Sequence, residues 1–224
     1  MKRKYYEAYD DRYRQVHGQN LKWFCESPSP IVAQTIDKYA IAPTQKLLEI
    51  GCGEGRDAFA LLKQGYKLLA TDISPAAIHY CNGKLPEYTD SFALLDCITG
   101  DLEVKFDFIF AVAVVHMLVE DEDRNCFYSF IRNYLSPNGI ALICTMGDGE
   151  TQLKTDPKSA FDLQDRIHEQ SGKHVQIAST SCRMVSFPEF HNELKRNGLR
   201  VLEEGFTSIE PDFPSMMYAV VSEE

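Results

Sequence analysis

Two patterns of hydrophobic and polar positions alternate along the chain from about residue 45 onward. Short apolar runs typical of buried strands occur at 46–50, 67–71, 91–95, 106–112 and 139–146. Between these runs lie segments with the pattern of helices. Strands that alternate with helices predict right-handed crossovers, which give a mostly parallel sheet with helices on both faces. The pattern therefore predicts an α/β fold with a doubly wound sheet.

Local signals mark where two helices begin and where another ends. Ser74 is followed by Pro75, and Ser29 by Pro30. A serine suits the N-cap because its side chain accepts a backbone N–H bond, and proline suits the first helical position because it has no N–H to satisfy. The segment LSPNG at 135–139 predicts a turn between a helix and the next strand.

The last part of the chain, residues 186–224, departs from the alternation. After a predicted helix near 188–197, two apolar runs at 199–206 and 216–223 follow, and the connection between them contains prolines. Strands that follow one another without a crossover helix pair as antiparallel neighbours. We therefore expect an antiparallel strand pair at one edge of the sheet.

Two longer regions lie outside the predicted core at 45–146. Residues 1–44 have a helical pattern with many aromatic side chains, and residues 147–185 are polar, with a short helix expected around 161–170. Ordinary connections in α/β units have about 2–6 residues, so regions of this length favour a functional role. We interpret 1–44 as a helical lid and 147–185 as a substrate-side insertion on a single domain, 1–224.

The composition limits the classes of function. The chain has 224 residues, enough for one domain with a substantial core, and its 23 basic and 33 acidic residues give a formal charge of −10. A general nucleic-acid binder presents a basic face, so the acidic balance argues against one. The apolar stretch at 108–119 is too short for a membrane span, and residues 1–11 do not resemble a signal peptide. Seven scattered cysteines without a C-x-x-C pair indicate neither a metal site nor disulfides, so we expect a cytoplasmic protein without a metal.

Candidate chemistry begins in the segment EIGCGEG, which starts at Glu49. A phosphate-binding P-loop needs Lys and then Ser or Thr after its last glycine, but Arg56 follows here. The spacing of Gly51, Gly53 and Gly55 also differs from the G-x-G-x-x-G of a dinucleotide site. A carboxylate before the first glycine would repel a pyrophosphate and favour an ammonium or sulfonium group. The segment therefore predicts a ligand that carries positive charge where a dinucleotide carries phosphate.

Two later strand ends carry carboxylates in matching places. Asp72 ends the second predicted strand, where doubly wound folds place an acid that accepts hydrogen bonds from both ribose hydroxyls. Asp96 and Cys97 follow the third predicted strand, at the expected place of a nucleoside base. Adenosine joined to a cationic amino acid is S-adenosylmethionine, which we predict as the cofactor.

These motifs resemble the class I S-adenosylmethionine-dependent methyltransferases of the small-molecule branch (type 11/12-like), from about residue 45 to 147 and more loosely to the end. EIGCGEG matches the family's first motif, ATDIS its second-strand acid and LLDC its adenine-side acid. FDFIFAVAVVHML and LSPNGIALI match its fourth and fifth strands, and residues 51–74 are similar to tellurite-resistance-type and thiopurine-type methyltransferases. The resemblance implies a seven-stranded Rossmann-like sheet whose last strand is antiparallel.

The predicted site combines strand ends with the N-terminal segment. The cofactor-binding residues that we predict are Glu49, Gly51, Cys52, Gly53, Gly55, Asp72, Ile73, Asp96, Cys97, Ala111 and Tyr9. His116 follows the fourth strand, where the sheet of this family faces the substrate, so it is the candidate catalytic residue. A neutral imidazole there accepts a proton from the acceptor, or its ring is merely buried and bonded to a carbonyl, and both interpretations stay open. Tyr5, Tyr9 and Tyr13 share one helix face by their spacing, a pattern more typical of packing than of recognition.

The function that we expect is methyl transfer to a small-molecule acceptor by in-line displacement, in a site that excludes water. One alternative is a non-catalytic S-adenosylmethionine-binding protein or a partner subunit of an enzyme complex. A nucleic-acid methyltransferase is disfavoured because AVAVVH stands where such enzymes commonly carry N/D-P-P-Y/F. A nicotinamide dehydrogenase is disfavoured by the glycine spacing and Glu49. We expect no nucleic-acid or membrane partner, and either a monomer or a homodimer.

Overall fold

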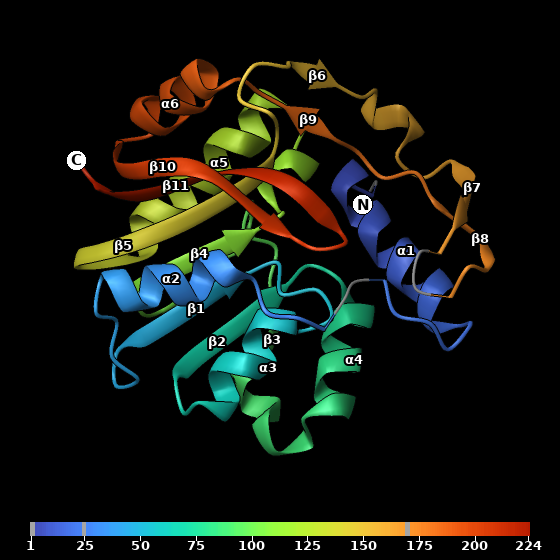
Figure 1. Ribbon diagram of the computed structural model, residues 1–224, viewed down its shortest axis with the longest axis horizontal. Helices are drawn as coiled ribbons and strands as arrows, with labels where there is room; N and C mark the ends of the chain where they lie inside the picture. Colours follow the sequence, from blue (N-terminus) through green and yellow to red (C-terminus); the bar gives the residue numbers. More distant parts are fainter. Residues whose placement is uncertain (1–2, 24–25, 169–170) are drawn as a thin grey trace.

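The computed structural model describes residues 3–23, 26–168 and 171–224 (Figure 1). Its central sheet has seven strands in the order β10-β11-β5-β4-β1-β2-β3. The bounds are β1 Lys46–Ile50, β2 Lys67–Asp72, β3 Phe92–Leu94, β4 Phe106–Val112, β5 Leu135–Met146, β10 Leu199–Ile209 and β11 Phe213–Glu223. The pairs from β5 to β3 are parallel, and β11 is antiparallel to both of its neighbours. The predicted α/β sheet with an antiparallel last strand is confirmed.

Helices cover both faces of this sheet. One layer contains α2 (Pro30–Lys38), α3 (Arg56–Lys63) and α4 (Pro75–Lys84), and the other contains α5 (Asp121–Tyr134) and α6 (Phe187–Arg196). Short 3-10 turns are η1 Tyr5–Glu7, η2 Pro86–Ser91, η3 Val115–Met117 and η4 Pro157–Ser159. In β4, Phe108 and Phe110 pack in the first layer while Ile109 and Ala111 pack in the second, since successive strand residues point to opposite faces. This double burial explains why the strands are continuous apolar runs.

Both predicted helix starts are confirmed. Pro75 and Pro30 are the first residues of α4 and α2. The Oγ of Ser74 accepts the N–H of Ala77 at 3.1 Å, as an N-cap serine should. Ser29 instead donates from its Oγ to a carboxylate oxygen of Asp57 at 2.7 Å, which fastens the start of α2 to the first turn of α3.

The last strand of the chain does not form the edge of the sheet. β11 lies between β5 and β10, so β10 is the edge strand of the predicted antiparallel pair. The predicted turn at 135–139 is incorporated into β5, with Asn138 at a φ of +66°. Regular pairing of β5 with β4 resumes where Ile140 faces Phe108.

The two regions outside the core lie side by side. Helix α1 (Ala8–His17) packs on a hairpin formed by β7 (Leu163–Ile167) and β8 (His174–Ala178), and β6 (Leu153–Lys154) pairs with β9 (Arg183–Met184) (Figure 1). The helix predicted around 161–170 is therefore wrong over residues 161–168, where the chain forms the strand β7 at 163–167, and residues 169–170 lie outside the described residues. The reason is tertiary: Val175 and Ile177 of β8 bury against Val16, and this packing outweighs the local helical preference of the polar β7 sequence.

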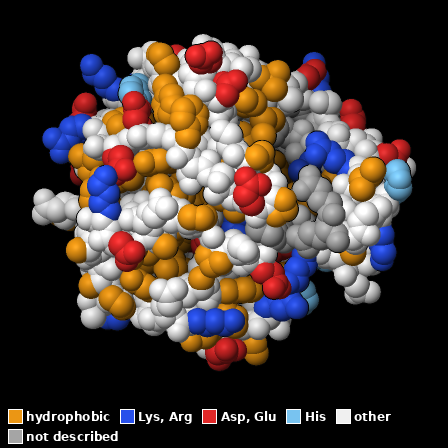
Figure 2. Space-filling view, viewed as in Figure 1, with side chains coloured by type: hydrophobic (Ala, Val, Ile, Leu, Met, Phe, Trp, Pro, Cys, Tyr) orange, Lys and Arg blue, Asp and Glu red, His pale blue; other side chains and the backbone are white. Residues whose placement is uncertain are grey.

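The surface carries charges of both signs. On the face shown in Figure 2, acidic and basic side chains of the described residues are scattered among hydrophobic and other polar surface, and the basic ones form no continuous area. None of the helices in the described ranges combines the length and apolar character needed to cross a bilayer. The same ranges contain no group of three or more His, Cys, Asp or Glu side chains arranged to hold a metal ion.

Candidate functional site

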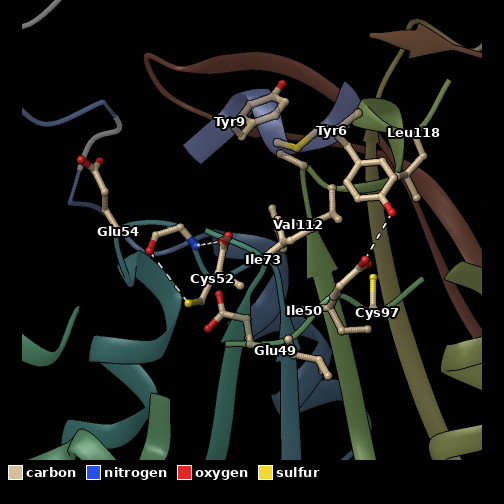
Figure 3. Close-up of a pocket in the computed structure, with 18 of the residues that line it drawn as sticks. Tyr6, Tyr9, Glu49, Ile50, Cys52, Glu54, Ile73, Cys97, Val112 and Leu118 are labelled. Carbon is tan, nitrogen blue, oxygen red and sulfur yellow. Dashed lines mark hydrogen bonds between the residues drawn. The ribbon is translucent and has the colours of Figure 1, made fainter. Parts of the chain in front are cut away.

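A cavity lies at the carboxyl ends of β1, β2 and β4, next to α1 (Figure 3). Parallel strands bring their carboxyl ends and the loops that follow to one edge of the sheet, which is where doubly wound folds bind ligands. In Figure 3, Glu49 lies at the bottom of the cavity, and Tyr6 and Tyr9 from the N-terminal segment lie opposite. The cavity therefore lies between the predicted cofactor-binding core and the predicted lid.

Two glycines of the first loop are required by both backbone conformation and space. Gly51 and Gly53 line the cavity with φ values of +74° and +53°, which residues with a side chain rarely adopt. A Cβ at Gly51 would lie 2.5 Å from Val114, and a Cβ at Gly53 would lie 2.6 Å from the hydroxyl of Tyr13. The side chains of Val114 and Tyr13 therefore pack directly on the backbone of this loop and leave no room for a side chain at either glycine.

Glu49 is a buried carboxyl group at the floor of the cavity. Its side chain is 4% exposed, and its Oε2 has no hydrogen-bond partner among the described residues. Burial, and then the charge of Asp57, raise the pKa of Glu49 well above its ordinary value, while Arg56 opposes the shift. A cationic ligand group would favour the ionised form and provide the missing partner.

Asp72 lies at the end of β2 and is also buried. One carboxylate oxygen accepts the N–H of Gly53 and the other accepts the N–H of Ser74, both at 2.8 Å. Burial raises the pKa of Asp72 to about 6, and the two backbone hydrogen bonds limit the shift. A carboxylate has about four acceptor positions, so Asp72 retains capacity for further donors. Ile73, the next residue, also lines the cavity.

The far end of the cavity contains Asp96 and Cys97, the two residues that we predict to flank the adenine. Asp96 accepts a hydrogen bond from the N–H of Ile98 at 2.9 Å and another from the hydroxyl of Tyr6 at 3.3 Å. Burial raises the pKa of the Cys97 thiol, so that side chain is neutral. Cys52 of the glycine loop also lines the cavity.

The tyrosines that line the cavity differ from the predicted stripe. Tyr6, Tyr9 and Tyr13 contribute to its wall, whereas the hydroxyl of Tyr5 donates to Asp123 at 2.7 Å. The prediction of Tyr5, Tyr9 and Tyr13 on one face is wrong because Tyr5 belongs to the 3-10 turn η1, whose residues are spaced at wider angles than those of α1. The i, i+3, i+7 spacing of the other three tyrosines was the available signal.

Two predicted residues do not reach the cavity. Ala111 is buried in the second helical layer, and the lining begins one residue later at Val112. Gly55 precedes α3, and a Cβ there would lie 2.5 Å from the ring of Phe59. Phe213, at the start of β11, lines the cavity without any signal in the sequence that an aromatic residue so far along the chain belongs to the site.

His116 lies in a second cavity that adjoins the first. Its side chain is buried, and Nδ1 has no hydrogen-bond partner among the described residues. Burial, and then the charge of Arg124, lower the pKa of His116 to about 3, so the ring is neutral. Trp23 also lines this second cavity, whereas His17 hydrogen-bonds to Glu54 at 2.7 Å outside it.

Comparison with protein families matches residues 48–141 to a family described as a methyltransferase domain, Methyltransf_12. Comparison with curated protein sequences finds no match. The family match runs from within β1 to within β5, and this segment contains the predicted glycine loop and both carboxylate strand ends.

Several solved structures with a similar fold are described as methyltransferases. The CcbJ methyltransferase from Streptomyces caelestis has a TM-score of 0.71 at 16% identity, over 97% of this chain and 98% of that chain. The glycopeptide N-methyltransferase MtfA in complex with S-adenosylmethionine has a TM-score of 0.63 at 18% identity, over 88% and 95%. A TehB-like S-adenosylmethionine-dependent methyltransferase from Corynebacterium glutamicum has a TM-score of 0.59 at 21% identity, over 98% of each chain. The resemblance to the class I methyltransferases is confirmed, and the finer similarity to tellurite-resistance and thiopurine types stays a prediction.

Proposed function

We propose that this chain, whose residues 48–141 form a methyltransferase domain in a class I fold, transfers a methyl group from S-adenosylmethionine to a small-molecule acceptor. The observation that carries the proposal is the buried carboxyl group of Glu49, whose Oε2 has no hydrogen-bond partner among the described residues. Burial disfavours its ionised form, the charge of Arg56 offsets this only in part, and a ligand that brings an ammonium group next to Glu49 would lower the remaining penalty. The glycine loop and Asp72 lie beside it in the same cavity.

Each end of the cavity suits one part of the cofactor. Glu49 would bind the ammonium group of the methionine part, next to the bare backbone of Gly51 and Gly53. Asp72 would accept the ribose hydroxyls with the acceptor capacity that its two backbone bonds leave. Asp96 would flank the adenine edge from the end of β3.

The reaction needs positioning and exclusion of water more than it needs strong acids or bases. When bound, S-adenosylmethionine would supply an electrophilic methyl group on a positively charged sulfur, which becomes a neutral thioether once the methyl group has been transferred. Tyr9, Met117 and Phe213 line both cavities, so they form the border at which acceptor and cofactor would meet. Their apolar side chains exclude water there, and aromatic faces attract a cationic sulfur.

His116 is the proposed catalytic residue of the second cavity. The pKa of about 3 means that its ring is neutral and able to accept a hydrogen bond at physiological pH. Such a weak base suits orientation of an acceptor N–H or O–H better than full proton removal, so the methylated product would lose its proton to bulk water when it leaves the site. We expect His116→Asn to lower kcat while the affinity for S-adenosylhomocysteine stays unchanged.

The test has two stages. Calorimetry first measures binding of S-adenosylhomocysteine, and an assay of its formation from S-adenosylmethionine then screens small nitrogen, oxygen and sulfur nucleophiles. We expect one-to-one binding and acceptor-dependent turnover. Absence of binding would refute the proposal, and binding without turnover on any acceptor would favour a non-catalytic binding protein. Turnover on DNA or RNA instead of small molecules would favour the nucleic-acid alternative.

A further inference from the structure

The second cavity adjoins the proposed cofactor cavity, and the side chains that line it indicate which kind of acceptor would fit. Its walls come from α1, η3, β7, residues 179–182 and the start of β11. These walls combine the predicted lid with the predicted substrate-side insertion. A molecule bound here would face the first cavity across Tyr9 and Phe213, so the inference rests on the function proposed above.

Arg12 is the buried cation of this cavity, with 7% of its surface exposed. Its Nε and Nη2 donate hydrogen bonds to the carbonyl oxygens of Ala178 and Ser179 and to Oγ1 of Thr180, at 2.8–3.2 Å. These bonds hold the guanidinium in one orientation. They leave the two N–H groups of Nη1 without a protein acceptor in the described part of the chain.

Arg12 also has no carboxylate within ion-pair distance among the described residues. Burial, and more weakly the positive charge of Arg166, lower the pKa of Arg12. A charge in a protein interior is normally paired, because removal from water is strongly unfavourable. The arrangement is therefore an oriented guanidinium that an anionic ligand would stabilise.

The other charged and titratable groups of the cavity leave an excess of positive charge. Arg166 of β7 adds a second guanidinium at the exposed side. Asp212 is an acidic residue of the wall, and its carboxylate lies 3.9 Å from Arg56 of the first cavity. His116 is neutral, and both ring nitrogens of His168 hydrogen-bond to other parts of the chain. A cationic cavity stands out in a protein with a formal charge of −10.

The rest of the wall is aromatic and apolar. The guanidinium carbon of Arg12 lies 4.8 Å from the ring centre of Trp23 and 5.1 Å from that of Tyr9. Phe213 and Met146 add apolar surface to the same cavity. Flat aromatic walls beside a cation suit a ligand with a planar apolar body and an anionic group at one end.

We propose that the methyl acceptor is a small aromatic carboxylic acid. Its carboxylate pairs with Nη1 of Arg12 and with Arg166, because a guanidinium matches the geometry of a carboxylate and its charge is always present. Its ring lies against Trp23, and its nucleophilic group lies between His116 and the border with the cofactor cavity.

Trp23 provides a direct probe, since it is the only tryptophan of the chain. Tryptophan fluorescence is followed while the protein is titrated, both with and without bound S-adenosylhomocysteine. The ligands are benzoate and phenylacetate, and the matched neutral controls are benzamide and phenylacetamide. We expect saturable changes with the carboxylates and affinities at least about tenfold weaker for the amides. Equal affinities, no response to either carboxylate, or tighter binding of phenyl phosphate would overturn the proposal.

Variants separate recognition from support of the hairpin. Arg12→Gln should weaken benzoate binding at least about tenfold and change the affinity for S-adenosylhomocysteine by less than about threefold. Gln15→Ala is the matched control, because Oε1 of Gln15 accepts the N–H of Ala178 at 2.7 Å and joins the same two elements without a charge. It should leave benzoate binding unchanged, and an equal loss in both variants would show that Arg12 is only a structural tie.

A second cation keeps the test decisive if Arg12→Gln does not fold. Arg166 is exposed on β7, so Arg166→Gln is compatible with the fold and should weaken benzoate severalfold. No effect of Arg166→Gln together with an unfolded Arg12→Gln would count against the proposal. Calorimetry with S-adenosylhomocysteine tests the proposed function separately. If the unmodified protein does not bind S-adenosylhomocysteine, methyl transfer is refuted. If it binds S-adenosylhomocysteine but shows no preference for carboxylates over amides, only the acceptor class is refuted.

Discussion

Ser74 donates a hydrogen bond from Oγ to Oδ1 of Asp10 at 2.7 Å, between residues 64 positions apart in the sequence. Oδ1 of Asp10 also accepts the N–H of Ala76 at 3.1 Å. Asp10 thus places a negative charge at the N-terminus of α4, where the helix dipole favours it. Because Ser74 follows Asp72 by two residues, this contact fastens α1 beside the ribose end of the cavity.

Loss of the hydrogen bond between Ser74 and Asp10 should speed the release of S-adenosylhomocysteine. We expect Asp10→Ala to raise the dissociation rate of S-adenosylhomocysteine severalfold, because α1 would cover the cavity less firmly. Stopped-flow displacement measures the rate. Asp11→Ala is the control. Asp11 forms an ion pair with Arg3 at 3.0 Å, and neither residue lines the cavity. A similar rate change in both variants would contradict the role given to Asp10.

The N-terminal segment should behave as a lid. Its residues Tyr6, Tyr9 and Tyr13 line the cofactor cavity, so bound ligand would hold it in place. We expect hydrogen exchange in residues 1–24 to slow when S-adenosylhomocysteine binds. Strong and equal protection with and without the ligand would mean that the segment is permanently docked and only packs against the core.

Asp72 should account for a large part of cofactor affinity. Hydrogen bonds to a charged group contribute roughly 1.5–3 kcal/mol each, so loss of two ribose contacts in Asp72→Ala predicts a drop of at least about tenfold. Asp72 also accepts the N–H groups of Gly53 and Ser74, so circular dichroism must show that the fold survives. Affinity by calorimetry equal to that of the unmodified protein would exclude Asp72 from ribose binding.

Cofactor affinity should rise with pH through the titration of Asp72. Burial raises its pKa to about 6, Asp10 adds to the shift, and ribose hydroxyls bond more strongly to the ionised form. Below that pH the carboxyl must first lose its proton, so affinity falls by up to about tenfold per pH unit, and above it affinity levels off.

Calorimetry with S-adenosylhomocysteine between about pH 5 and 8 follows this step. Asp72→Asn should abolish it. The pKa of Glu49 is also raised, so ionisation of Glu49 also increases cofactor affinity as the pH rises. Asp72→Asn should therefore lose the step near pH 6 but keep this gradual increase. A step near pH 6 that persists in Asp72→Asn would assign it to another group.

Gly53→Ala should damage both stability and ligand binding. An alanine at a φ of +53° is strained by about 1–2 kcal/mol, and its Cβ would displace the hydroxyl of Tyr13. Gly65 is the matched control, because its φ is +84° and a Cβ there would meet no atom within 4 Å. We expect both variants to lower the free energy of unfolding in urea, but only Gly53→Ala to weaken S-adenosylhomocysteine. Equal ligand affinity in the two variants would show that the contact with Tyr13 is dispensable.

The sequence by itself determined the sheet, the glycine loop and the order of the carboxylates at the strand ends. Each of these depends on residues close together in the chain: a run of apolar residues forms a strand, and the loop after it continues at the same sheet edge. Glu49, Asp72 and Asp96 could therefore be placed near one another before any contact was known. The helix expected around 161–170 failed because pairing with β8, which packs on α1, outweighs the local helical preference of this polar segment.

Only the tertiary structure decided how that edge is covered and what the second cavity contains. Arg12 meets Ala178 across 166 positions, and Phe213 joins residues of β1 in one cavity wall. The choice of Tyr6 over Tyr5 followed from the turn before α1, and the cavity lining begins at Val112 because Ala111 is still buried in the core. Such contacts depend on packing between segments that are distant in the sequence. The free energy of that packing is set by shape and burial in the folded chain, so no periodic pattern of residues in the sequence predicts it.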